Sequence, residues 1–125
     1  MKLTRAEEQI MQVLWDLEEA FVKEILKRLD DPKPAYNTVS TIVRILEKKG
    51  FVSHHAYGKS HKYYPLVSRE EYTRTTMKNF VKDYFSNSFE KMVSFFARER
   101  EIDLKEMEDI MRIMQEEIEK QKRNG

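Results

Sequence analysis

The chain has 125 residues, of which 40% are hydrophobic and 36% are charged, and this composition suffices for one domain with a buried core. Its 23 Lys and Arg residues nearly balance 22 Asp and Glu residues, which excludes a disordered polyelectrolyte, since such chains combine low hydrophobicity with high net charge. The sequence contains no apolar run of membrane-spanning length, no secretory signal and no Cys, so we expect a soluble, cytoplasmic protein without disulfides or thiolate metal sites.

Positive charge is concentrated in one central segment of the chain. Residues 1–32 carry 5 basic and 8 acidic side chains, and residues 66–125 carry 12 and 13, whereas residues 33–65 carry 6 basic side chains against Glu47 alone. Phosphate backbones attract such a segment by counterion release, a contribution that does not depend on nucleotide sequence. A basic face that is merely solvated has the same pattern, so charge by itself leaves both interpretations open.

The start of the chain predicts two short amphipathic helices. Thr4 and Glu7 have the spacing of a capping box, and apolar residues at helical intervals follow, which predicts a helix over residues 5–18. The same periodicity predicts a second helix over residues 22–29. The Pro-containing stretch 30–34 then interrupts the pattern, because proline lacks an N–H and restricts the residue before it.

A basic helix and a hairpin follow. Residues 36–49 have one apolar face and one face of short polar side chains followed by cations, and Gly50 suits the left-handed position after such a helix. Residues 51–66 place aromatic and β-branched residues around a Gly-containing turn, which predicts a β-hairpin. This order of elements is that of a winged helix-turn-helix, to which we assign residues 1–68.

The rest of the chain, residues 69–125, is predicted to be a helical dimerisation domain. Ser68 and Glu71 form a second capping pair that opens a helical stretch to about residue 96, with a weak point at residues 86–88 where the helix can bend or break. Asp103 caps a last helix that runs to about Lys122. We therefore expect two helices, and a mainly α protein with a small β wing.

These two predicted helices have more apolar positions than they can bury against each other. Exposed apolar patches of this kind usually mark an interface, and pairing with a second copy would cover them symmetrically. The alternative is a monomer in which the helices fold back on the N-terminal domain. The predicted dimerisation residues are Phe85, Phe89, Met92, Phe96, Met107, Met111, Met114 and Ile118.

The helix over residues 36–49 fits duplex DNA in size and chemistry. An α-helix is about 10–12 Å across, and the major groove of B-DNA is about 12 Å wide. Short polar side chains near its start can reach base edges, and its arginine can reach guanine or phosphate. Lysines on the hairpin would contact the DNA backbone. The predicted DNA-binding residues are Asn37, Thr38, Ser40, Thr41, Arg44, Lys48, Lys59 and Lys62.

Other kinds of site find less support in the sequence. His54, His55 and His61 lie in the hairpin, but neighbouring strand residues point to opposite faces and zinc usually takes four ligands, so we expect no metal. We also expect no cofactor and no enzyme activity, since no nucleophile–base spacing, paired carboxylates or phosphate loop stands out. Two alternatives without DNA binding remain open: a winged-helix protein-interaction module and a helical adaptor that senses a ligand.

Several segments together resemble the penicillinase-repressor family (BlaI/MecI/CopY). They are residues 3–7 with 13–15, residues 36–41, residues 46–52, residues 57–59 with 63–65, and residues 88–96. Each segment is short, but their combined spacing covers nearly the whole chain.

The resemblance implies a homodimeric transcriptional repressor that binds a palindromic operator through its recognition helix, residues 36–49, and its wing, residues 51–66. It also implies a membrane sensor-protease as a partner in the resistance branch, where a cut at an Asn-Phe bond inactivates the repressor. Phe95-Phe96 stands at that position here, and the Cys-x-Cys pairs of the copper-responsive branch are absent. Neither release mechanism is therefore carried over to this chain by the resemblance.

Overall fold

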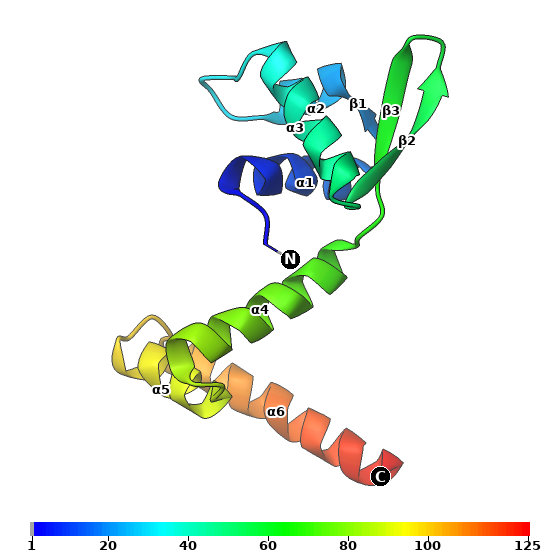
Figure 1. The fold of residues 1–125 in the computed structure, drawn as a ribbon. Helices are drawn as coiled ribbons and strands as arrows, with labels where there is room; N and C mark the ends of the chain where they lie inside the picture. The colour runs from blue at the N-terminus through cyan, green and yellow to red at the C-terminus, as the bar shows by residue number, and fades with distance from the viewer. Residues whose placement is uncertain (1) are drawn as a thin grey trace. The chain divides into compact units, whose positions relative to one another are not determined.

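The computed structural model describes residues 2–125 and confirms a mainly helical fold with a small β wing (Figure 1). The chain divides into two compact units, one that ends at Thr76 and one from Met77 to Gly125. The elements are α1 (Arg5–Leu17), β1 (Ala20–Phe21), α2 (Val22–Arg28), α3 (Tyr36–Lys48), β2 (Val52–Tyr57), β3 (Ser60–Pro65), α4 (Arg69–Phe85), α5 (Phe89–Arg98) and α6 (Leu104–Asn124).

Helix α1 begins with the capping box that the sequence predicts. The Thr4 hydroxyl accepts a hydrogen bond from the Glu7 N–H at 3.2 Å, and the Glu7 carboxylate accepts one from the Thr4 N–H at 2.8 Å. Two N–H groups without partners inside the helix are thereby satisfied. The helix then buries Ile10, Met11 and Leu14, so the same local signal that starts α1 also sets which face it turns inward.

The hairpin of the wing, β2 and β3, belongs to a three-stranded antiparallel sheet with the order β1-β3-β2. Its hairpin pairs Val52 with Pro65 at one end and Tyr57 with Ser60 at the other, so the turn has two residues, and Gly58 adopts a φ of 63° there. That positive φ is one that glycine adopts without steric cost. Strand β1, which pairs Ala20 with Tyr63, was not predicted, because two residues show no alternating pattern.

The core of the first unit lies between α1, α2, α3 and the sheet. Apolar side chains from each of these elements meet there, and the most deeply buried are Ile10, Met11, Leu14, Ile25, Val39, Val43, Leu46 and Val52. Gly50 follows α3 with a φ of 84°, as predicted, and turns the chain directly into the buried Phe51.

The first turns of α4 complete the first unit. Tyr72 is buried against Trp15 and Phe51, with ring centroids 5.7 Å and 6.1 Å away. The Tyr72 hydroxyl accepts a hydrogen bond from the Leu3 N–H at 3.4 Å, and the Trp15 indole N–H donates to the Val67 carbonyl at 2.9 Å. The root of α4 is thus fixed by aromatic contacts and hydrogen bonds to the N-terminal part of the chain.

The region after residue 68 contains three helices, so the prediction of two was wrong. The stretch to residue 96 breaks at the predicted weak point, where Ser86 and Asn87 adopt φ values of 52° and 64°. The Asn87 N–H donates to the Val81 carbonyl at 3.1 Å and closes α4, and the Ser88 hydroxyl accepts from the Lys91 N–H at 3.1 Å and opens α5. Asparagine tolerates the left-handed region and serine caps helices well, which explains a clean break rather than a bend.

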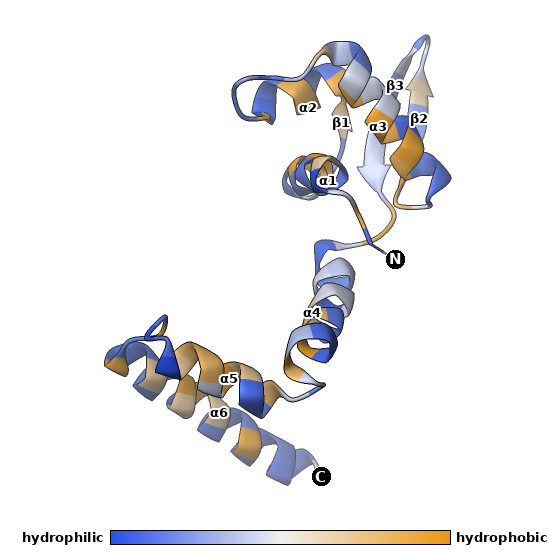
Figure 2. Ribbon diagram, turned by 60° about the vertical axis from the view of Figure 1, so that its left-hand side comes forward, coloured by the Kyte–Doolittle hydropathy of each residue, from blue (hydrophilic) through white to orange (hydrophobic). Residues whose placement is uncertain are grey.

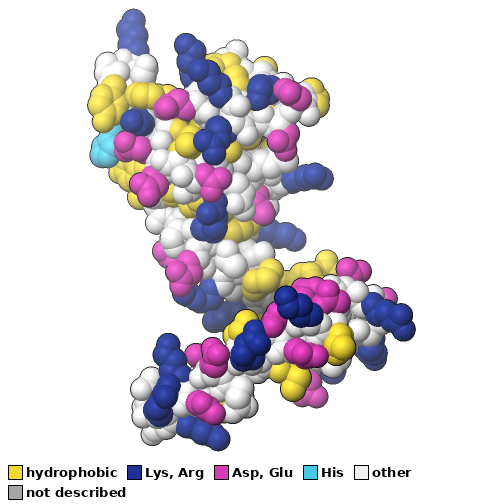
Figure 3. Space-filling model, turned by 180° about the vertical axis from the view of Figure 1, so that it is seen from behind, with side chains coloured by type: hydrophobic (Ala, Val, Ile, Leu, Met, Phe, Trp, Pro, Cys, Tyr) yellow, Lys and Arg dark blue, Asp and Glu magenta, His cyan; other side chains and the backbone are white. Residues whose placement is uncertain are grey.

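The second unit buries little of its apolar surface. Val81 is the one buried side chain among residues 77–125, and aromatic rings of α4 and α5 form a partly exposed cluster around Phe85. Apolar residues recur between polar ones along α5 and α6 (Figure 2), and hydrophobic side chains reach the surface of this unit among charged ones (Figure 3). Four of the predicted dimerisation residues are half-buried: Phe85, Met92, Phe96 and Met107. The other four are exposed: Phe89, Met111, Met114 and Ile118.

Candidate nucleic-acid interface

Helix α3 separates its buried and exposed residues sharply. Val39, Val43 and Leu46 are fully buried against the core of the first unit. On the other side, Ser40 is half-exposed, and five further predicted DNA-binding residues are exposed: Asn37, Thr38, Thr41, Arg44 and Lys48. Ala35, which precedes the helix, offers no side-chain cap, so no side chain of the N-cap residue satisfies the N–H groups at the positive end of the helix dipole.

The polar side chains of this face are partly held by the helix itself. The Thr41 hydroxyl donates to the Asn37 carbonyl at 2.9 Å, and the Arg44 guanidinium donates to the Ser40 carbonyl at 3.3 Å and to the Ser40 hydroxyl at 3.4 Å. These contacts are exposed, and both Arg44 contacts are long, so a base edge or a phosphate can replace them at small cost.

Ion pairs divide the basic residues of the central segment into two groups. Lys49 pairs with Glu7 at 2.8 Å, Lys62 pairs with Glu19 at 3.1 Å, and Lys33 donates to the backbone carbonyls of Lys27 and Leu29. Arg44, Lys48 and Lys59, like Lys33, form no ion pair within residues 2–125. Two of the six basic residues of the central segment are therefore paired with carboxylates, and the charges of the other four stay available to an external anion.

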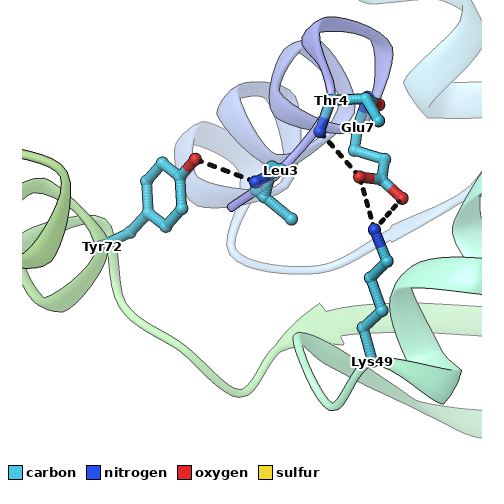
Figure 4. Close-up of polar contacts among 5 residues, drawn as sticks. All are labelled: Leu3, Thr4, Glu7, Lys49 and Tyr72. Carbon is cyan, nitrogen blue, oxygen red and sulfur yellow. Dashed lines mark hydrogen bonds and ion pairs between the residues drawn. The ribbon is translucent and has the colours of Figure 1, made fainter. Parts of the chain in front are cut away.

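The Glu7–Lys49 pair joins the start of α1 to the end of α3 (Figure 4). Both carboxylate oxygens of Glu7 accept from the Lys49 ammonium, at 2.9 and 2.8 Å, and the Glu7 side chain is 6% exposed. Burial alone would raise the pKa of the Glu7 carboxyl, but hydrogen bonds from Lys49 and Thr4, together with the Lys49 charge, outweigh burial and lower that pKa. Sequence reasoning missed this pair because its members are 42 residues apart.

The wing presents one lysine freely and retains the other. Lys59 is exposed in the two-residue turn, whereas the Lys62 ammonium lies 5.4 Å from the centre of the Phe21 ring and pairs with Glu19. The hydrogen bond to Glu19 raises the pKa of Lys62, so its charge is stabilised by the protein. A phosphate contact by Lys62 would require this pair to open, whereas Lys59 needs no such change.

The histidines of the hairpin are divided between the two faces of the sheet. The His54 Nδ1 lies 2.6 Å from a Glu47 carboxylate oxygen, and its ring stacks on His61 with centroids 4.0 Å apart. On the other face, His55 stacks on Tyr64 at 4.8 Å. Across residues 2–125, no three His, Asp or Glu side chains are arranged to hold a metal ion.

Two residues that the sequence analysis did not single out also border this surface. Lys23 from the first turn of α2 and Tyr36 from the start of α3 line an open groove beside the wing. No pattern in the sequence indicates that these two residues lie near each other, because their proximity depends on how α2, α3 and β3 pack.

None of the helices in the described chain, residues 2–125, is both long and apolar enough to cross a membrane.

Comparisons with known proteins agree with this architecture. A family model described as "Penicillinase repressor" matches residues 3–116. The methicillin resistance regulatory protein MecI of Staphylococcus aureus (strain N315) is 25% identical over 114 residues, which are 90% of this chain and 93% of that protein. The penicillinase repressor of Bacillus licheniformis is 23% identical over 116 residues, with coverages of 92% and 91%.

Part of the chain is also similar to a solved structure. It is the solution structure of the DNA-binding domain of the repressor BlaI, with a TM-score of 0.50 and 28% identity over 57% of this chain and 88% of that domain. The similarity supports the winged-helix assignment made from the order of elements. Since the family model spans nearly the whole chain and the expected segments fold as described, the protein belongs to the penicillinase repressor family.

Proposed function

We propose that this protein is a transcriptional repressor that binds double-stranded DNA through α3 and the wing. The observation that carries the proposal is the exposed polar face of α3, together with Arg44, Lys48 and Lys59, whose charges no carboxylate of the described chain neutralises by an ion pair. Membership of the penicillinase repressor family and the likeness to the BlaI DNA-binding domain support it.

The side chains of this surface have two roles: some contact base edges and so recognise the nucleotide sequence, and others contact the DNA backbone. Asn37, Thr38, Ser40 and Thr41 lie in the first two turns of α3, where a helix in the major groove brings its side chains to base edges. Arg44 reaches guanine or a phosphate, and Lys48 and Lys59 contact phosphates. Lys62 reaches the backbone only when its pair with Glu19 opens.

We further propose that two copies act together on a palindromic site. Helices α5 and α6 expose several large apolar residues, soluble monomers rarely expose large apolar patches, and a second copy offers the same surface in return. Two recognition helices would then lie about 34–36 Å apart, one turn of DNA. The dimer would block transcription in the bacterial cytoplasm, and a membrane sensor-protease is a proposed partner.

The test is binding of the full chain to two labelled duplexes, one from the DNA upstream of its gene and one shuffled. We expect tighter binding to the first duplex and an affinity for both that falls as salt rises. Replacing Thr41 or Arg44 with Ala should change the preference between duplexes, whereas K59A should weaken both and K62A should do so less. Salt-independent or absent binding would favour the protein-interaction alternative and would refute the proposal.

A further inference from the structure

We propose that the groove between α2, α3 and the wing seats one strand of the DNA sugar–phosphate backbone, with Lys23 as its cation on the α2 side. The inference rests on the proposed function and assigns a backbone subsite and a contact residue within it. It concerns the first unit alone, in which α1, α2, α3 and the sheet share one core.

The groove has a volume of about 620 Å³ and opens to solvent beside the recognition helix. Three parts of the fold supply its walls: the β1–α2 junction, the start of α3, and the tip of the hairpin with β3. Apart from Glu24 and the buried Tyr63, its polar lining residues are Lys23, Tyr36, Ser40, Lys59, Ser60 and His61. Each of these side chains can donate a hydrogen bond, as a phosphate oxygen requires.

Two cations face this groove from opposite sides. Lys23 comes from the first turn of α2 and Lys59 from the hairpin turn, and neither forms an ion pair within residues 2–125. Glu24 also lines the groove, but its carboxylate accepts the Phe21 N–H at 2.8 Å and caps the start of α2. The groove therefore offers unpaired positive charge while its carboxylate has a structural role.

The position of the groove indicates a polymer rather than a small anion. Ser40 and Tyr36 belong both to the groove wall and to α3, so the groove is continuous with the face proposed to enter the major groove. When a helix occupies the major groove and a wing lies beside it, the backbone that borders the groove passes between them. A phosphodiester on that path would contact Lys23, Lys59 and the hydroxyl groups that line the groove.

Helix α2 offers a matched control for Lys23. Lys27 lies one helical turn further along, is also exposed, and also forms no ion pair within the described residues, but it does not line the groove. The two lysines carry the same charge and belong to the same helix, and they differ only in their position relative to the groove. A general effect of net charge would appear in both variants, whereas a backbone seat involves Lys23 alone.

The experiment measures the affinity of the full chain, K23A, K27A and K23R for the upstream and shuffled duplexes across a salt series. We expect K23A to weaken binding about five- to tenfold on both duplexes and to reduce the slope of log K against log salt by about 0.9. K27A should match the wild type, and K23R should recover the slope. Equal behaviour of K23A and K27A, with salt-dependent binding intact in the wild type, would overturn the inference.

A second arm separates a DNA strand from free phosphate. Thermal unfolding is followed by Trp15 fluorescence, with inorganic phosphate or chloride at matched ionic strength. We expect no stabilisation specific to phosphate in either the wild type or K23A. A phosphate-specific shift that K23A abolishes while its DNA affinity stays unchanged would identify a small-anion site and would refute the backbone seat. Loss of DNA binding by the wild type would instead refute the proposed function.

Discussion

The two units of this protein respond differently to the same kind of sequence signal. Both contain amphipathic helices with good caps, yet the first unit collects its apolar residues into one core and the second buries Val81 alone. In the first unit α1, α2, α3 and the sheet each supply an apolar face to the same interior. Helix formation and helix burial therefore have separate requirements. Within one chain, the second unit forms its helices but does not bury their apolar faces.

Two leucines provide the sharpest test of this contrast. Leu14 in α1 is fully buried and Leu104 in α6 is 71% exposed, so the same truncation meets opposite environments. We expect L14A to lower the free energy of unfolding by about 3 kcal/mol, through lost burial and a residual cavity. L104A should change it by less than about 0.5 kcal/mol. Denaturant unfolding, followed by Trp15 fluorescence and far-UV circular dichroism, measures both, and equal losses would erase the distinction.

The proposed dimer can be broken at an exposed residue of the second unit. Met111 is 70% exposed, so M111E should leave the folded monomer intact but weaken self-association by on the order of 2 kcal/mol, about thirtyfold. The control is K105Q, which changes the net charge equally and lies about 120° around α6 from Met111 at 3.6 residues per turn. Sedimentation velocity over a concentration series gives the result. A wild type that stays monomeric throughout would contradict the proposal.

The Glu7–Lys49 pair makes the stability of the first unit depend on pH. A carboxyl whose pKa is lower in the folded than in the unfolded state stabilises the fold at neutral pH, and this stabilisation is lost as pH falls through the lowered pKa. We expect E7Q to cost on the order of 1.5 kcal/mol at neutral pH, less than a fully buried pair costs, because the Lys49 side chain is 35% exposed.

The diagnostic readout for E7Q is the acid side of the stability profile. E7Q should flatten the fall in stability below about pH 5, where an ordinary glutamate begins to take up a proton. E8Q serves as control, since Glu8 is the next residue of α1 and forms no ion pair within residues 2–125. Parallel acid profiles for E7Q and the wild type would show that the pair has no such role.

The smallest expected effect concerns a surface pair near the boundary of the units. Arg74 and Glu70 are one turn apart on α4, 3.2 Å from each other, with side chains 57% and 85% exposed. Solvent screens such a pair, so R74A should change the free energy of unfolding by no more than about 0.5 kcal/mol. Chemical denaturation at low and high salt checks this. A loss near that of E7Q would mean that exposure is a poor guide to the strength of pairs in this protein.

Local chemistry made much of the fold predictable. Thr4 with Glu7, Gly50 and Gly58 each occupy the position that their side chain or backbone freedom favours, and the helices and hairpin of the first unit follow. Strand β1 escaped prediction because its two residues pair only through β3. The sequence marked residues 86–88 as a weak point but did not decide between a bend and the break, with left-handed Ser86 and Asn87, that creates the third C-terminal helix. These features depend on context rather than on pattern.

The candidate interface was predictable as a face but not as a set of available charges. The apolar positions of α3 fix which side chains point outward, and the exposed residues match that expectation. Sequence could not show that Lys49 and Lys62 are held by Glu7 and Glu19, because these partners lie 42 and 43 residues away. Nor could it place Lys23 beside the wing, since that proximity arises from tertiary packing.

The docking of Tyr72 has a practical consequence for anyone who wishes to isolate the first unit. A fragment that stops at residue 68 would lack the Tyr72 ring, which packs on Trp15 and Phe51, and would expose both of these aromatic rings to solvent. It would also discard the Arg69 guanidinium, which lies 2.6 Å from an Asp16 carboxylate oxygen and over the Trp15 ring. A fragment that extends through Thr76 retains all of these contacts, so expression boundaries for a minimal headpiece belong inside α4 rather than before it.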